Sequence, residues 1–173
     1  MADEPKVFVL RRGFVVPLTL LVLLTLILLC VLAVQSQPLA KMIILALLLV
    51  PLGGLAVESA RRRLLVDESG VTALRLLRSR RVNFVDVTSL EAVRVRSRIF
   101  LTLVAGDDDF LIISNSYAGF AELLTLLLAR LPAEAVTPEA QALAESKLGR
   151  SGDIITAWFA VAAMIYILLA QFR

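Results

Sequence analysis

Histidine is absent from this sequence, and only one cysteine, Cys30, is present. A disulfide bond within the chain is therefore impossible, and a zinc site built from cysteine and histidine is excluded. The chain also lacks the side chain that most often acts as a general base near neutral pH. No Gly-rich phosphate loop, H-E-x-x-H motif or nucleophile elbow occurs. We therefore expect no catalytic, cofactor-binding or metal-binding residues, and we expect a protein that is not an enzyme.

Charged side chains are missing from a long stretch near the start of the chain. Phe14–Val34 contains none, and as a helix it would be about 31 Å long, close to the thickness of a bilayer's hydrocarbon core. Two further apolar runs are Leu39–Val57 and Ile154–Ala170, and hydrophobic residues make up 59% of the 173 positions. This composition predicts a membrane protein with three transmembrane helices, over residues 14–34, 39–57 and 153–171.

The first two runs are joined by the short segment 35–38, which predicts an antiparallel helical hairpin. Pro51, Gly53 and Gly54 lie near the end of the second run and should kink or loosen its last turns. Tight packing of these residues against the first helix is expected, with a functional hinge as the alternative. A cleaved signal peptide is the alternative for the first run, with Val31-Leu32-Ala33 as the cleavage site. That run is longer than a typical signal-peptide core, and two further apolar segments follow it.

Positive charge beside these runs predicts the orientation, because cytoplasmic flanks carry an excess of lysine and arginine. Basic residues precede the first run, follow the second and precede the third: Lys6, Arg11, Arg12, Arg61, Arg62, Arg63, Lys147 and Arg150. The connection between the first two runs offers only Lys41. We therefore expect a multi-pass protein of the cell membrane, with residues 1–13 and the middle domain cytoplasmic and the C-terminus extracytoplasmic.

Between the second and third runs the apolar stretches become short and rich in Val, Ile and Phe, a pattern that predicts β-strands. We place strands over residues 62–67, 71–77, 80–85, 91–97, 99–104 and 110–114. Glu68-Ser69-Gly70 predicts a tight turn whose glycine can take a positive φ. Phe110–Ile113 does not alternate, which predicts a strand that is covered on both faces.

An amphipathic helix follows the last of these strands, with Ser116 as its expected N-cap and Pro132 at its end. A second helix is expected over residues 138–148. The predicted fold class is therefore three transmembrane α-helices with an inserted α+β domain, a bent antiparallel sheet or small barrel capped by a C-terminal helix. The domain occupies residues 59–132, and a helical linker occupies residues 133–152.

The stretch LLVDESGVTALRLLRSRRVNFVDVTSLEAVRV resembles bacterial pleckstrin-homology-like domains. Those families have a strand, a glycine turn, a basic strand, and then an aromatic strand leading to an acidic and aliphatic step, here Phe84, Asp86, Leu90 and Val93. The later LTLVAGDDDFLIISNSYAGFAELLTLLLARLP resembles their closing hairpin and capping helix. Many members carry a two-helix membrane hairpin just before the domain. The resemblance implies a seven-stranded fold, one strand more than the six predicted here, and location at a bacterial inner membrane.

Arginines form the most suggestive cluster of polar residues. Arg75, Arg78, Arg80 and Arg81 surround one predicted hairpin, and Arg94, Arg96 and Arg98 recur with period two along one strand face. Close to a membrane, each could contribute about 1 kcal/mol of attraction to anionic head groups. The alternative is a solvated strand face that also serves as a topology signal. No interleaved aromatic residues point to nucleic acid, which we do not expect as a partner.

Asp107, Asp108 and Asp109 lack the ligand spacing of an EF-hand, so a hydrated turn is expected there rather than a calcium site. The leading functional hypothesis is a binding or scaffolding module, recruiting a protein partner or contacting the anionic lipid surface. The alternative is an accessory or assembly subunit of a larger membrane complex or homo-oligomer, with the transmembrane helices as the main interface.

Overall fold

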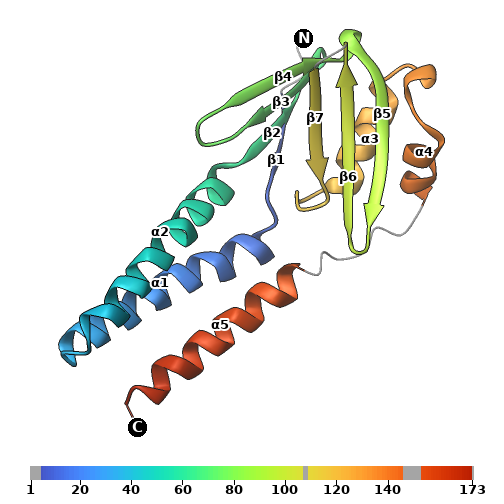
Figure 1. Ribbon diagram of the computed structural model, residues 1–173. Helices are drawn as coiled ribbons and strands as arrows, with labels where there is room; N and C mark the ends of the chain where they lie inside the picture. The colour runs from blue at the N-terminus through green and yellow to red at the C-terminus, as the bar shows by residue number, and fades with distance from the viewer. Residues whose placement is uncertain (1–4, 107–108, 146–152, 173) are drawn as a thin grey trace. The chain divides into compact units, whose positions relative to one another are not determined.

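A computed structural model describes residues 5–106, 109–145 and 153–172. Contacts within the chain divide it into two compact units (Figure 1). We call residues 1–11 with 61–152 the module, and residues 12–60 with 153–173 the helical unit. Each is described by itself.

The helical unit contains α1 (Arg12–Val34), all but the last residue of α2 (Leu39–Arg61), and α5 (Asp153–Ala170). By length and composition, α1 and α2 are able to cross a membrane, whereas α5 is a shorter apolar helix. Pro17 lies in the first turns of α1 and Pro51 lies within α2.

Within the helical unit, α1 and α5 lie side by side and run parallel (Figure 1). A Cβ on Gly13 would lie 3.4 Å from the side chain of Ile154, where both helices begin. Where both end, the Gln35 side-chain amide donates to the Gln171 carbonyl at 3.1 Å. The expected packing of Gly53 and Gly54 against the first helix is wrong, because among the described residues no atom lies within 4 Å of a Cβ at either position.

The module begins with a four-stranded antiparallel sheet in the order β1-β2-β3-β4. Its strands are β1 (Lys6–Val9), β2 (Arg63–Val66), β3 (Gly70–Leu74) and β4 (Ser79–Asn83). The N-terminal residues had been expected to form a separate cytoplasmic segment. Instead they supply the first strand of the sheet, with Phe8 buried in the core.

A three-stranded antiparallel sheet follows, made of β5 (Val87–Val95), β6 (Arg98–Ala105) and β7 (Asp109–Ser114). All six predicted strands therefore occur in the structure, with ends shifted by a few residues. The expectation that β7 is covered on both faces is wrong. Leu111 and Ile113 are buried whereas Phe110 and Ile112 are exposed, so the strand alternates after all.

Helix α3 (Phe120–Arg130) buries Phe120, Leu123, Leu124 and Leu127. The inward side chains of the second sheet, such as Leu101 and Leu103, are equally buried and complete the core. Ser116 does not cap this helix; Gly119, with a φ of 71°, occupies the N-cap position and makes no side-chain bond.

The expected linker is in part a component of the module. A short 3₁₀ turn (Ala133–Ala135) precedes α4 (Pro138–Glu145). The backbone N–H of Thr137 donates to the Leu90 carbonyl at 3.2 Å and its hydroxyl donates to the same oxygen at 2.9 Å. This segment therefore covers the outer edge of β5. The rest of the predicted second helix lies outside the described residues.

Candidate anion-binding site

The chain leaves the first sheet toward α1 and returns to it from α2 at the same end. Val9, where β1 leads toward α1, pairs with Arg63, where the chain returns from α2. Arg63 pairs in turn with Leu74 of β3, and Leu74 pairs with Ser79 of β4. We call this the exit end of the sheet. The opposite end, with the turn between β2 and β3, is the far end.

The second sheet turns at the exit end as well. The Asn115 side chain donates to the Ser97 carbonyl at 3.0 Å, in the turn between β5 and β6. A few residues on, the Ala118 N–H donates to the Val9 carbonyl at 2.8 Å and the Arg11 N–H donates to the Ser116 carbonyl at 2.9 Å. The β3–β4 loop and the β5–β6 turn therefore both belong to the end of the module from which the chain passes into α1.

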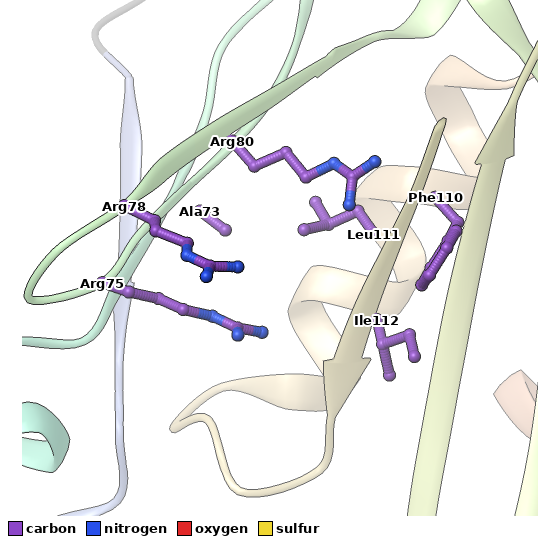
Figure 2. Close-up of a pocket in the computed structure, with 7 residues that line it drawn as sticks. All are labelled: Ala73, Arg75, Arg78, Arg80, Phe110, Leu111 and Ile112. Atoms are coloured by element: carbon purple, nitrogen blue, oxygen red, sulfur yellow. The ribbon is translucent and has the colours of Figure 1, made fainter. Parts of the chain in front are cut away.

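Arg75 and Arg78 belong to the β3–β4 loop. The Arg75 N–H donates to the Arg78 carbonyl at 2.8 Å and closes the loop. Both side chains point into a cavity of about 250 Å³, whose other wall is formed by Phe110, Leu111 and Ile112 of β7 (Figure 2). Within the described part of the chain, neither guanidinium has a carboxylate partner. Two uncompensated positive charges beside an apolar wall suit an anionic group with an apolar attachment.

Arg80 lines the same cavity but is already engaged. Its Nη2 atom donates to Asp109 Oδ1 at 2.6 Å, and its guanidinium lies 5.2 Å from the centre of the Phe110 ring. Both contacts bridge the edges of β4 and β7. Arg80 therefore fastens the two sheets together, and less of its charge is available to a ligand than that of Arg75 or Arg78.

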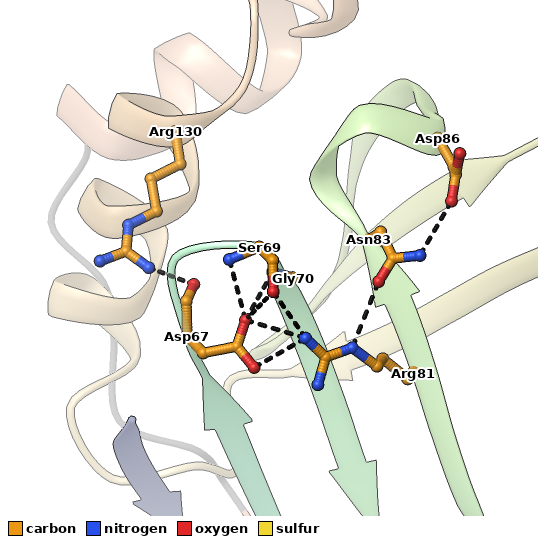
Figure 3. A network of polar contacts seen from close by, with 7 residues as sticks. All are labelled: Asp67, Ser69, Gly70, Arg81, Asn83, Asp86 and Arg130. Carbon is orange, nitrogen blue, oxygen red and sulfur yellow. Dashed lines mark hydrogen bonds and ion pairs between the residues drawn. The ribbon is translucent and has the colours of Figure 1, made fainter. Parts of the chain in front are cut away.

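Arg81 does not belong with the other arginines of its predicted cluster. Its side chain points to the far end and donates to Asp67 at 2.9 Å, to the Ser69 hydroxyl at 2.6 Å and to the Asn83 amide oxygen at 3.2 Å (Figure 3). Arg130 of α3 donates to the backbone carbonyl of Asp67 from the other side. Arg81 therefore stabilises the β2–β3 turn and is not available for an external anion.

Asp67 is the centre of this network. The Ser69 hydroxyl donates to the Asp67 carboxylate at 2.8 Å, and the backbone N–H groups of Ser69 and Gly70 donate at 2.9 Å and 2.8 Å. These hydrogen bonds, with the charge of Arg81, lower the pKa of Asp67 below its ordinary value, although partial burial opposes the change. Asp67 is therefore held as a carboxylate by the turn that it organises.

The period-two face predicted for Arg94, Arg96 and Arg98 is wrong, because the chain reverses direction within this stretch. Arg94 is the last residue but one of β5 and pairs with Ile99, and Arg98 begins β6 and pairs with Val95. Paired residues share a face, so Arg94 and Arg98 lie on opposite faces of the sheet. Arg96 lies in the turn itself, with a left-handed φ of 55°. The three still gather at one end of the second sheet, which is the exit end.

Arg62 has a structural role, in contact with Tyr117, that the sequence pattern did not predict. The sequence predicted it to belong to a basic run beside an apolar segment and to begin the first strand. In the structure its Nε donates to the Tyr117 hydroxyl at 2.9 Å, and its guanidinium lies 5.6 Å from the ring centre. Arg11 donates to the Tyr117 carbonyl at 3.3 Å. Two of the flanking basic residues therefore hold the buried Tyr117 in place.

The described residues hold no group of three potential metal ligands from histidine, cysteine, aspartate and glutamate. Asp107 and Asp108 lie outside the described residues, and Asp109 is paired with Arg80. Compared with family models, with curated proteins and with solved structures, the chain has no match in any of the three.

Proposed function

We propose that this chain is a membrane protein with three crossings that carries a cytoplasmic pleckstrin-homology-like module. The arrangement of strands supports the likeness: among the described residues, four antiparallel strands are followed by three more and then by a helix against the core. On this proposal β1, which precedes α1 and α2, supplies the seventh strand that the sequence prediction lacked. In this proposal the hairpin is an insertion between the first and second strands, where the resemblance had implied an addition before the domain.

The function that we propose for the module is to bind the anionic surface of the membrane that anchors it. One observation carries this proposal: the exit end bears Arg75, Arg78, Arg94 and Arg96, and within the described residues none of them has a carboxylate partner. The chain passes from this same end into α1. Each such arginine would contribute about 1 kcal/mol near an anionic leaflet, less at high salt.

Native mass spectrometry of the full chain tests this function. The protein is extracted in mild detergent from bilayers that contain phosphatidylcholine and phosphatidylglycerol, and the retained lipids are counted. Replacing Arg75, Arg78, Arg94 and Arg96 together by Gln should abolish the preference for phosphatidylglycerol. The matched variant with four Lys keeps the charge and should retain the preference. Equal lipid retention by the Gln variant and the natural protein would contradict the proposal.

An accessory subunit of a larger complex is the second candidate. It is favoured by α2, whose buried residues among those described are Ala56 and Ser59, which leaves most of the helix surface open to lipid or to another protein. On this view the helices form the main interface. Purification of the full chain in mild detergent, followed by mass spectrometry, should then recover membrane partners in fixed ratio, and the four-Gln variant should recover them equally well.

A further inference from the structure

We propose that the tip of the β3–β4 hairpin, Leu76-Leu77, inserts into the interfacial region of the bilayer and forms an additional membrane contact of the module. This inference rests on the proposed function and deepens it, because it names the lipid-contacting element. The exposed tip contacts lipid, as the composition of the turn, its exposure and its position along the chain indicate.

The turn has an unusual composition for a tip that remains in water. The hydrogen bond from Arg75 to Arg78 leaves Leu76 and Leu77 as its two central residues. Such positions are normally occupied by Gly, Asn, Asp, Pro or Ser. Among the described non-glycine residues, positive φ occurs at Ser36 and Arg96, so neither leucine adopts the left-handed conformation that glycine favours. The local backbone conformation permits leucine at both positions, but it gives no reason why both central residues of the turn are apolar.

Both leucines are directed to solvent. Leu77 is 91% exposed, and Leu76 is 39% exposed. Single exposed leucines are common on protein surfaces. Two adjacent leucines at a hairpin tip, flanked on both sides by arginines without a carboxylate partner in the described chain, form an amphipathic end. That combination matches a bilayer interface, in which phosphates lie immediately above acyl chains.

The position of the hairpin along the chain suits this contact. Leu74, the last residue of β3, pairs with Arg63, where the chain returns to the sheet from α2. The hairpin tip lies two residues beyond this pair, about 6–7 Å farther along a strand. The tip therefore projects past the exit end of the sheet, where the chain connects to α1 and α2.

A fluorescent label placed at the tip tests the insertion in the full chain. The only cysteine is removed by Cys30→Ser, and an environment-sensitive nitrobenzoxadiazole label is attached to Leu77→Cys. Val85→Cys is the matched control, because Val85 is also an apolar residue in a short turn, is 94% exposed, and follows β4 at the far end. Both proteins are reconstituted into phosphatidylcholine vesicles with or without phosphatidylglycerol. Quenching by nitroxide-bearing lipids then reports contact with the bilayer.

We expect quenching of the label at position 77 to exceed that at position 85 by at least about threefold, together with a blue-shifted emission. Equal quenching at both positions would overturn the inference, because the fluorescent label would then enter the bilayer by itself, wherever it is attached. A blue shift at position 77 without lipid quenching would also overturn it and would assign the tip to a protein contact. If position 77 remains in water while the four-Gln variant still loses its lipid preference, the insertion fails and the proposed function stands.

Discussion

At the scale of single residues, the β2–β3 turn illustrates how a carboxylate and a glycine define a local structure. The sequence predicted a tight turn at Glu68-Ser69-Gly70, and the structure confirms it. The role expected for Gly70 was a positive φ, but among the described glycines positive φ is found at Gly106 and Gly119. Gly70 is required instead because a Cβ would lie against the Val82 carbonyl and 2.9 Å from Asn83 Cα. Such an approach between strands is not visible in a sequence.

Replacing Gly70 by Ala should therefore destabilise the module by about 1–3 kcal/mol, because backbone atoms of β4 would have to move. The measurement is the midpoint of thermal denaturation of the full chain in detergent. Gly53→Ala is the control, since the space around its Cβ is open among the described residues, and its effect should be within about 0.5 kcal/mol. Equal midpoints for the two variants would show that β4 accommodates the methyl group at no cost.

The lowered pKa of Asp67 predicts how stability depends on pH. The folded module favours the carboxylate, so its contribution is fully present above the ordinary value of 3.8 and is lost as the pH falls through the lower folded value. Asp67→Asn removes an acceptor of these hydrogen bonds and should therefore lower the free energy of unfolding near neutral pH by about 1–2 kcal/mol. The melting midpoint should accordingly fall most near neutral pH. The difference from the natural protein should shrink below about pH 4. A difference that is constant from pH 7 to pH 3 would contradict this account.

At the scale of elements, strand β1 separates what the sequence could predict from what it could not. Six strands were predicted because each is a local pattern of apolar residues bounded by turn residues. β1 has four residues, and its partner β2 is separated from it by the two long helices α1 and α2. No local pattern specifies such a distant pairing. The same limit explains the arginines: their clustering could be predicted, but the turn at Arg96 and the engagement of Arg81 depend on tertiary contacts.

The contribution of β1 to the module is testable through Phe8, which is 4% exposed and would lie 3.4 Å from a Cβ on Gly119. Phe8→Ala should destabilise the module by about 3–5 kcal/mol, through lost burial and the cavity that remains. Val7→Ala on the exposed face of the same strand is the control and should change little. Hydrogen exchange of β2 would report the loss directly. Unchanged protection of β2 in Phe8→Ala would mean that the sheet does not need its first strand.

At the scale of the whole molecule, the pairing of β1 with β2 constrains the path of the chain. Both strands belong to one sheet, so the chain must leave and return to the same side of any membrane that α1 and α2 cross. This requirement is independent of the positive-inside rule and agrees with the orientation that the flanking arginines predict. It also explains why two apolar helices can be inserted within a β module: neighbouring antiparallel strands tolerate a long connection between adjacent ends.

With both ends of the α1–α2 segment on one side, α5 is the helix whose crossing decides on which side of the membrane the C-terminus lies. If α5 crosses, as we propose, residues beyond it lie opposite the module. In a Cys30→Ser background, cysteines at Val85 and Phe172, both exposed, are treated with a membrane-impermeant maleimide in sealed vesicles of each orientation. On the proposed orientation, position 85 should be labelled and position 172 protected in inside-out vesicles, and right-side-out vesicles should give the reverse. Labelling of both positions from the same side would contradict the proposed third crossing, because α5 would then lie along the membrane surface instead of spanning the membrane.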